Sequence, residues 1–224
     1  AGLTVMLVII WIFYSANGPQ TTAVLAGTVR AATLLALGAM CGMIGERSGV
    51  VNIGIEGQFL LSAFAAFTIA SMTGSLFMGT VAGIGMGLMM GWLLAAMAVG
   101  LKVDQIIAGT VLNIAALGLT SFFYDRSRSL GIGKYTNIDL GPLADIPLVG
   151  TVFFSRPPLT YLTMALLVVV HIALFRSVWG MRTRAIGEHP GAADTVGIDV
   201  LRLRYLNVTL AGGLAGLGGA YLAL

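Results

Sequence analysis

Long stretches without a charged residue constrain the fold of this chain more than any other feature of its sequence. Asp, Glu, Lys and Arg are absent from residues 1–29, 57–101, 105–124, 157–175 and 205–224. A helix crosses the hydrocarbon core of a bilayer with about 20 apolar residues, so these stretches suit membrane crossings. Charged residues make up 9% of the chain, against about 25% in water-soluble domains. The sequence therefore predicts an all-α fold, a polytopic transmembrane helical bundle.

The number of crossings follows from the length of each stretch. Residues 57–101 would form a single helix about 68 Å long, about twice the thickness of the bilayer core. We therefore expect the chain to reverse at Thr73-Gly74-Ser75. About seven crossings are visible: residues 3–14, 22–44, two within 57–101, then 105–124, 159–175 and 205–224. The first and last are incomplete, and we expect a longer polypeptide whose C-terminal part, with further spans, is absent here.

The basic residues predict the orientation of the bundle. Of the 12 Lys and Arg residues, seven lie in residues 45–58, 100–104 and 176–204, four lie in residues 125–158, and Arg30 lies within a span. Cytoplasmic connections of membrane proteins are enriched in Lys and Arg. We therefore expect the first three connections on the cytoplasmic side and 125–158 as an external loop. The net charge of +3 has the same origin and does not indicate nucleic-acid binding.

Glycines recur at helical spacing in two of the predicted spans. The two sets are Gly79, Gly83, Gly87 and Gly91, and Gly212 and Gly216. Small residues four apart let helices approach closely in lipid, where apolar contact alone does not drive association. The pattern predicts close helix packing, either within the chain or at a seam between two subunits. Both sets lie inside apolar spans with no strand before them, so neither indicates a nucleotide-binding loop.

The connection 176–204 is longer than a link between two spans requires. Pro190 suits the first position of a helix and Gly197 suits its end. This predicts a helix of about two turns, with Ala192, Ala193 and Val196 on one face. So short a helix is not stable in isolation. From the pattern alone, the segment is either a helix that docks on another cytoplasmic protein or a solvated loop.

The spacing Glu188-x3-Ala192-Ala193-x3-Gly197 resembles the cytoplasmic coupling loop of ABC-importer permeases, which inserts into the ATPase subunit. Residues 180–220 resemble permeases of the branched-chain amino acid and ribose-type class. Residues 45–58, with Asn-Ile-Gly-Ile-Glu-Gly-Gln at 52–58, are similar to the subgroup for nucleosides and related simple sugars. The resemblance covers nearly the whole chain, although these permeases continue with further spans past the equivalent of Leu224.

The resemblance implies a permease subunit of an ABC importer, not an enzyme, which moves nucleosides or related simple sugars by ATP-driven alternating access. It implies a multi-pass protein of the bacterial cytoplasmic (inner) membrane. The implied partners are an ABC ATPase subunit, a second and non-identical permease subunit, an extracytoplasmic substrate-binding protein and the lipid bilayer. The residues expected to couple to the ATPase are Arg184, Gly187, Glu188, Pro190, Ala192, Ala193 and Gly197.

No cofactor is expected in the chain itself. The sequence has no G-x-x-x-x-G-K-[ST] motif for binding phosphate, and the implied ATPase partner would bind ATP. The sequence has a single cysteine, Cys41, and no paired His and Cys residues at the spacing of metal ligands. We therefore expect no metal site.

The polar residues 45–58 are the second candidate for function. Asn52 and Glu56 are four apart and are expected to share a helix face. The segment is either a discontinuous helix near the middle of the membrane, whose free backbone groups can bind a polar substrate, or a cytoplasmic hairpin. Amide and carboxylate side chains suit the hydroxyls and base edges of a nucleoside. The candidates for the substrate path are Asn52, Glu56, Gln58 and Asn113, although Asn113 in mid-span is more typical of an interhelical hydrogen bond.

Three alternatives to a nucleoside importer follow from the sequence. The first is an ABC permease for ribose-type sugars or branched-chain amino acids. The second is an ion-coupled secondary transporter, which would normally need carboxylates within the membrane, whereas only Glu56 is an arguable case here. The third is a membrane enzyme, for which no converging nucleophile, base or metal cluster is visible.

Overall fold

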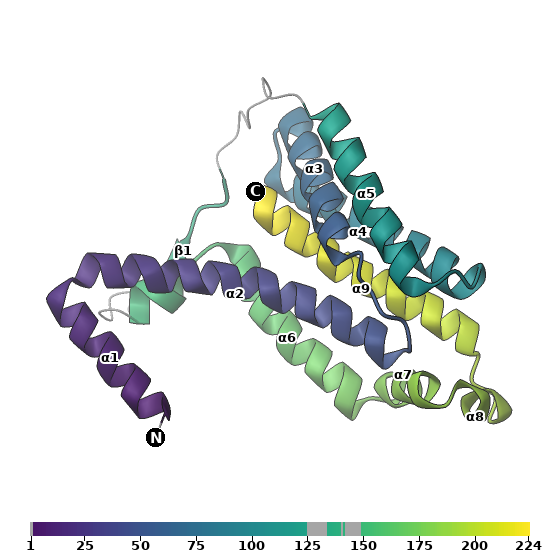
Figure 1. The fold of residues 1–224 in the computed structure, drawn as a ribbon. Helices are drawn as coiled ribbons and strands as arrows, with labels where there is room; N and C mark the ends of the chain where they lie inside the picture. The colour runs from purple at the N-terminus through teal and green to yellow at the C-terminus, as the bar shows by residue number, and fades with distance from the viewer. Residues whose placement is uncertain (1, 125–133, 140, 142–148) are drawn as a thin grey trace. The chain divides into compact units, whose positions relative to one another are not determined.

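The computed structural model describes residues 2–124, 134–139, 141 and 149–224, and these residues are mainly helical (Figure 1). The helices are α1 (Gly2–Ala16), α2 (Gly18–Arg47), α3 (Ile55–Thr73), α4 (Leu76–Ala95), α5 (Gln105–Phe123), α6 (Pro158–Arg176), α7 (Val178–Glu188), α8 (Pro190–Thr195) and α9 (Val200–Ala223), with the π-helical turns η1 (Ala96–Gly100) and η3 (Gly150–Phe154). Two short strands, β1 (Ile138–Asp139) and β2 (Ser155–Arg156), pair antiparallel. The chain divides into unit 1, Ala1–Leu35 with Tyr135–Met164, and unit 2, Ala36–Lys134 with Ala165–Leu224.

Each predicted crossing corresponds to a helix in the described part of the chain. Six of these helices are long and apolar enough to cross a bilayer: α2, α3, α4 continued by η1, α5, α6 and α9. The seventh, α1, has 15 residues, fewer than the roughly 17 that the shortest crossings use. The polytopic helical bundle is therefore confirmed, and six helices of the described residues have the length and hydropathy of a span.

The ends of the helices follow local chemistry. Gly74 ends α3 with a φ of 68°, a left-handed conformation that glycine adopts without strain. The Ser75 hydroxyl then accepts the Met78 N–H and begins α4. The predicted reversal at residues 73–75 is therefore confirmed. Asp104 begins α5 in the same way, because its carboxylate accepts the N–H groups of the first turn.

Two predicted connections are more helical than expected. In the connection 45–58, α2 continues to Arg47 and α3 begins at Ile55, so the break comprises only residues 48–54. In the connection 176–204, the structure contains the 11-residue helix α7, and α9 begins at Val200 rather than at residue 205. The physical reason for both α7 and the early start of α9 is capping. The Ser177 hydroxyl accepts the Gly180 N–H, and the Asp199 carboxylate accepts the Arg202 N–H.

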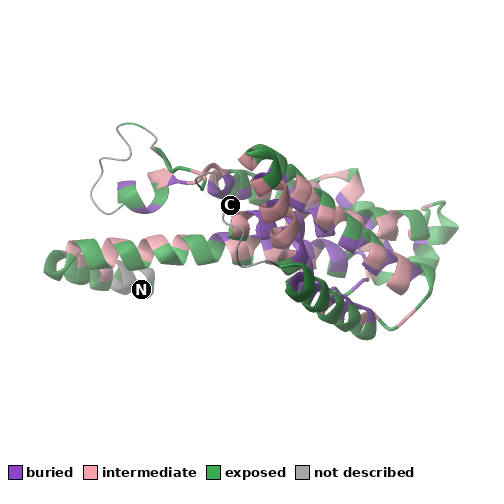
Figure 2. Ribbon diagram, turned by 90° about the horizontal axis from the view of Figure 1, so that it is seen from above, coloured by how far each residue is buried: buried purple, intermediate pink, exposed green. Residues whose placement is uncertain are grey.

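Unit 2 is built around α9. In α9, 61% of the most apolar stretch is buried, against 22–39% in the other five spanning helices of the described chain. The buried positions of unit 2 gather where its helices pack against one another (Figure 2). The helix α9 is therefore the central element of this unit.

The two glycine sets of the sequence meet each other between α4 and α9. A Cβ added to Gly83 would lie 3.0 Å from the Ala220 Cβ, and one added to Gly91 would lie 2.7 Å from the Val208 carbonyl oxygen. At Gly87 an added Cβ would overlap with the Gly212 carbonyl oxygen. Of the two alternatives, packing within the chain is therefore confirmed for these glycines. We call this contact the α4–α9 seam.

Unit 1 contains α1, the first part of α2, the β1–β2 pair, η3 and the start of α6. Arg156 of β2 is 2% exposed. Its Nε donates to the Val152 carbonyl at 2.6 Å and its Nη1 to the Ala26 carbonyl of α2 at 3.2 Å. Arg156 belongs to the predicted external loop 125–158, but the structure buries it inside unit 1. Arg126 and Arg128 of the predicted external loop 125–158 lie outside the described residues.

Candidate functional site

The short helix predicted within residues 176–204 is present as α8. Pro190 is its first residue, and Gly197, with a φ of +83°, ends it in a left-handed conformation. The Gly197 N–H donates to the Asp194 carbonyl at 2.9 Å, and the Ile198 N–H donates to the Ala193 carbonyl at 3.1 Å. These bonds satisfy carbonyls that the end of a helix leaves free. The predicted start and stop of this helix are confirmed.

The faces of α8 differ from the prediction. Ala193 is 4% exposed and packs inward, whereas Ala192 is exposed and Val196 is 74% exposed. The prediction that all three share one face is therefore wrong. Residues 192 and 196 are one helical turn apart and lie outward together, while tertiary contacts bury the residue between them. The outward pair leaves a small apolar surface at the C-terminal end of α8, because Val196 directly follows its last residue, Thr195.

Three of the predicted coupling residues lie on α7. Glu188, the last residue of α7, is exposed. The Arg184 guanidinium lies 5.6 Å from the centroid of the Phe175 ring, a cation–π distance. Gly187 packs on the end of α2, because an added Cβ would overlap with the Arg47 carbonyl oxygen. Six of the seven coupling residues thus lie in the helices α7 and α8, and Gly197 follows the end of α8.

A buried amide fixes α7 to α9. Asn207 of α9 is fully buried. Its Oδ1 accepts the Trp179 indole N–H at 3.0 Å, and its Nδ2 donates to the Thr183 hydroxyl at 3.1 Å. Since Trp179 and Thr183 are one turn apart on α7, a single side chain holds two successive turns of this helix. We expect α7 and the start of α9 to move together.

The α2–α3 break, residues 48–54, runs along the first turns of α5. The Val51 N–H donates to the Gln105 Oε1 at 2.7 Å, and a Cβ added to Gly54 would lie 3.4 Å from the Gly109 Cα. Farther along, the Asn113 amide donates to the Ile53 carbonyl at 3.1 Å and accepts the Gly57 N–H at 2.7 Å. Asn113 is eight residues beyond Gln105, about 12 Å along a helix. The chain therefore enters the bundle in this non-helical segment before α3 begins.

The four candidates for the substrate path lie in different surroundings. Asn52 precedes α3 and is not on a helix face with Glu56, so that prediction is wrong. Asn52 is 8% exposed and Gln58 is fully buried, and the Asn52 Nδ2 donates to the Gln58 Oε1 at 3.1 Å. Glu56 is exposed, and Asn113 is half-buried with both ends of its amide bonded to backbone. The structure therefore brings Asn52 and Gln58 together and keeps Glu56 apart from them.

The buried polar pair extends along the inner face of α3. The Cys41 thiol of α2 lies 3.4 Å from the Asn52 Nδ2. The Gln58 Nε2 and the Ser62 hydroxyl, one turn apart, are buried without a hydrogen-bond partner among the described residues. Ser62 packs against α9, because a Cβ added to Gly219 would lie 2.6 Å from the Ser62 Cβ. Of these two buried groups, only the Ser62 hydroxyl is therefore placed beside α9, whereas Gln58 lies beside Asn52 and Cys41.

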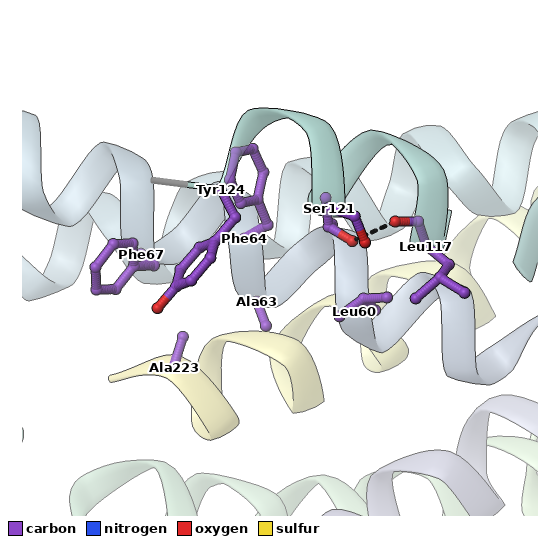
Figure 3. A pocket seen from close by; sticks show the side chains of 9 residues that line it. Leu60, Ala63, Phe64, Phe67, Leu117, Ser121, Tyr124 and Ala223 are labelled. Carbon is purple, nitrogen blue, oxygen red and sulfur yellow. Dashed lines mark hydrogen bonds between the residues drawn. The ribbon is translucent and has the colours of Figure 1, made fainter. Parts of the chain in front are cut away.

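A hollow of about 420 Å³ lies between α3, α5 and the end of α9 (Figure 3). Its lining is mainly apolar and consists of Leu60, Ala63, Phe64, Phe67, Leu117, Thr120, Ser121, Tyr124 and Ala223. The rings of Phe67 and Tyr124 lie with centroids 6.5 Å apart. None of the four predicted path residues lines this hollow, which lies along the middle of α3 and the C-terminal end of α5.

Residues 24–224 match the family described as "Branched-chain amino acid transport system / permease component". The chain belongs to this permease family. The permease is thus a multi-pass membrane protein of a transporter family rather than of an enzyme family.

Three curated relatives resemble the permease. "Putative glucose ABC transporter permease protein TsgC13" of Haloferax volcanii is 38% identical over 88% of this chain and 61% of its own length. "Guanosine ABC transporter permease protein NupQ" of Bacillus subtilis is 35% identical over 84% of this chain and 63% of its own length. "Nucleoside ABC transporter permease protein NupC" of Lactococcus lactis is 36% identical over 81% of this chain and 61% of its own length. The chain therefore spans less than two thirds of the length of these relatives. No solved structure matches the permease.

Sequence reasoning missed three residues of this region: Gln105, Arg204 and Asn207. Gln105 binds the α2–α3 break, Asn207 binds α7, and Arg204 donates to backbone carbonyls at the ends of two helices. A signal for Arg204 exists, because a cation beside a charge-free stretch needs a partner or a route to water. No pattern in the sequence indicates that these partners are the Ser48 and Ile186 carbonyls.

Proposed function

We propose that this permease is the membrane-spanning subunit of an ABC importer and that it works by ATP-driven alternating access. The match of residues 24–224 to the permease family is the observation that supports this most. The helices α7 and α8 add to it. They place Arg184, Glu188 and the exposed pair Ala192 and Val196 in one segment. In our proposal this segment contacts the ATPase subunit.

We infer that the substrates are nucleosides or related simple sugars. The three relatives have names that refer to glucose, guanosine and nucleosides. The motif at 52–58 supports the same class, through its resemblance to permeases of the nucleoside subgroup. Ribose-type sugars and branched-chain amino acids are the alternatives that an uptake assay separates.

The proposed transporter has further subunits. An ABC ATPase would bind ATP, a second and non-identical permease subunit would form the other wall of the path, and an extracytoplasmic protein would deliver substrate. We place the assembly in the bacterial cytoplasmic membrane, with α7 and α8 on the inner side. The excess of Lys and Arg in residues 45–58, 100–104 and 176–204 supports this orientation.

Asn52, Glu56, Gln58 and Asn113 remain our candidates for contact with substrate. Asn52 and Gln58 are buried, so in our proposal the α2–α3 break rearranges before they contact substrate. Glu56 is already exposed. Glu56→Ala is expected to weaken transport without releasing the ATPase, whereas loss of ATPase binding would place Glu56 on the cytoplasmic surface.

Purification and uptake test the proposal. The tagged full-length permease, purified from its own membrane, is expected to bring down an ATP-binding subunit in a fixed ratio. Membrane vesicles loaded with ATP are expected to take up radiolabelled guanosine in the presence of an ionophore. Uptake that an ionophore abolishes while ATP is intact would instead indicate an ion-coupled transporter, and purification without any ATPase would contradict the importer.

A further inference from the structure

Arg204, the fifth residue of α9, joins two segments that are far apart in the sequence. Its Nε donates to the Ser48 carbonyl at 3.0 Å, and its Nη2 donates to the Ile186 carbonyl at 3.1 Å. Ser48 directly follows the last residue of α2, and Ile186 lies in the last turn of α7. One guanidinium therefore links the α2–α3 break to the segment α7–α8.

The position of this guanidinium suits a cation. The last carbonyls of a helix have no partner within the helix, and the C-terminal end of a helix attracts positive charge. Arg204 lies at two such ends at once. Its planar group presents several N–H donors in a fixed geometry, so it satisfies both carbonyls with one side chain.

The neighbouring arginine on the same helix provides a contrast. Arg202 is exposed, and its side chain makes no hydrogen bond to the described part of the chain. Both residues lie in the first two turns of α9 and have the same charge. The difference between them is therefore the link that Arg204 makes, not the charge that it adds.

The backbones around Arg204 are in direct contact. A Cβ added to Gly49 would lie 2.8 Å from the Arg204 Nη2 and 3.4 Å from the Gly187 Cα. Gly49 also has a φ of +81°, which disfavours other residues. An added Cβ at Gly187 would overlap with the Arg47 carbonyl oxygen. With no side chains between them to give way, the end of α7 and the α2–α3 break are expected to move as one.

The α2–α3 break then extends this contact into the bundle. The Gln105 amide accepts the Val51 N–H, and the Asn113 amide bonds to both the Ile53 carbonyl and the Gly57 N–H. These bonds reach the first turn of α3, where Gln58 is buried. The backbone from Ser48 to the first turn of α3 is therefore a continuous, hydrogen-bonded route between Arg204 and the inner face of α3.

We propose that Arg204 is the positioning residue that transmits movement of α7 and α8 to the α2–α3 break and from there to the inner face of α3. This inference rests on the proposed function, because it assumes that an ATPase moves α7 and α8. It assigns a task to residues 48–54, namely transmission, in addition to any contact with substrate.

The test uses the intact transporter, reconstituted in liposomes with its ATPase, second permease and binding protein. The measured quantity is the number of ATP molecules hydrolysed for each radiolabelled guanosine imported. Arg204→Gln is expected to raise this ratio at least tenfold while the ATPase still co-purifies. Arg204→Lys keeps the charge but not the planar group. Its ratio is expected to lie between that of Arg204→Gln and that of the wild type. The matched control Arg202→Gln is expected to stay within twofold of the wild type.

A second measurement needs no variant. Hydrogen exchange of residues 48–57 in the wild-type transporter is expected to change when ATP is added, because the α2–α3 break follows α7. Unchanged exchange there, or a ratio for Arg204→Gln equal to that of Arg202→Gln, would overturn the inference. A wild-type assembly that imports no guanosine with ATP would instead contradict the proposed function, so the two failures are distinguishable.

Discussion

The α4–α9 seam and the α2–α3 break both lie in unit 2, but different forces hold them. At the seam, glycines bring two helix backbones into contact, as at Gly87 and Gly212. At the break, the side-chain amides of Gln105 and Asn113 bond to the non-helical backbone and to the first turn of α3. Close-packed backbones have no second arrangement without overlap or a void. Hydrogen bonds can be exchanged for others at a small net change in free energy. We therefore expect the seam to stay fixed and the break to rearrange during transport.

The largest effect on folding is expected at the α4–α9 seam. Gly87→Ala would place a Cβ against the Gly212 carbonyl oxygen and lower the free energy of unfolding by about 3 kcal/mol. The measurement is the melting temperature of the purified permease in detergent. The control is Gly85→Ala on the same helix, where an added Cβ meets nothing within 4 Å. Equal melting temperatures for the two variants would show that the seam is not tightly packed.

The next effect is expected at the α2–α3 break. Asn113→Ala removes the hydrogen-bond partner of the Gly57 N–H and of the Ile53 carbonyl. The free energy of unfolding is expected to fall by about 2 kcal/mol. Hydrogen exchange of residues 53–57 should become faster, while exchange at the seam stays unchanged. Thr110→Ala is the control on α5, because among the described residues its hydroxyl bonds only to the Ile106 carbonyl of its own helix. Faster exchange at the seam as well would mean that the break and the seam are one cooperative unit.

A smaller loss of stability but a larger loss of transport is expected at the contact between α7 and the break. Gly187→Ala would separate α7 from the end of α2. This substitution is expected to lower the free energy of unfolding by about 1 kcal/mol. Uptake by the intact transporter should fall about tenfold while the ATPase stays bound. Gly191→Ala in α8, where an added Cβ has no neighbour within 4 Å, should transport normally. Normal uptake by both variants would argue against transmission through this contact.

The smallest effect on stability is expected on the outer surface of α8. Val196 is 74% exposed, so Val196→Asp should change the free energy of unfolding by less than about 0.5 kcal/mol. If α8 contacts the ATPase, the affinity between the two subunits should fall about tenfold, because a charge would be buried at the interface. Val196→Thr, with a similar shape, should bind nearly as the wild type does. An unchanged affinity for Val196→Asp would remove α8 from the proposed interface.

Local sequence predicted the ends of α8 but not which of its residues are buried. Pro190 and Gly197 define the ends of the helix through their own backbone geometry, so their positions were predictable. The burial of Ala193 beside the exposed Ala192 was not, because it depends on which side of a six-residue helix faces α9. The same limit applies to Asn52, which we expected on a helix face with Glu56 but which lies in the non-helical segment that Asn113 contacts at Ile53.

The sequence by itself determined where the chain crosses the membrane, where it reverses at Gly74 and where α8 begins and ends. These features depend on the length of apolar stretches and on the backbone preferences of single residues. The tertiary structure alone decided that the two glycine sets face each other and that Arg204 bonds to a carbonyl 156 positions away. Such pairings depend on how whole helices are placed against one another, and no local pattern in the sequence specifies that placement.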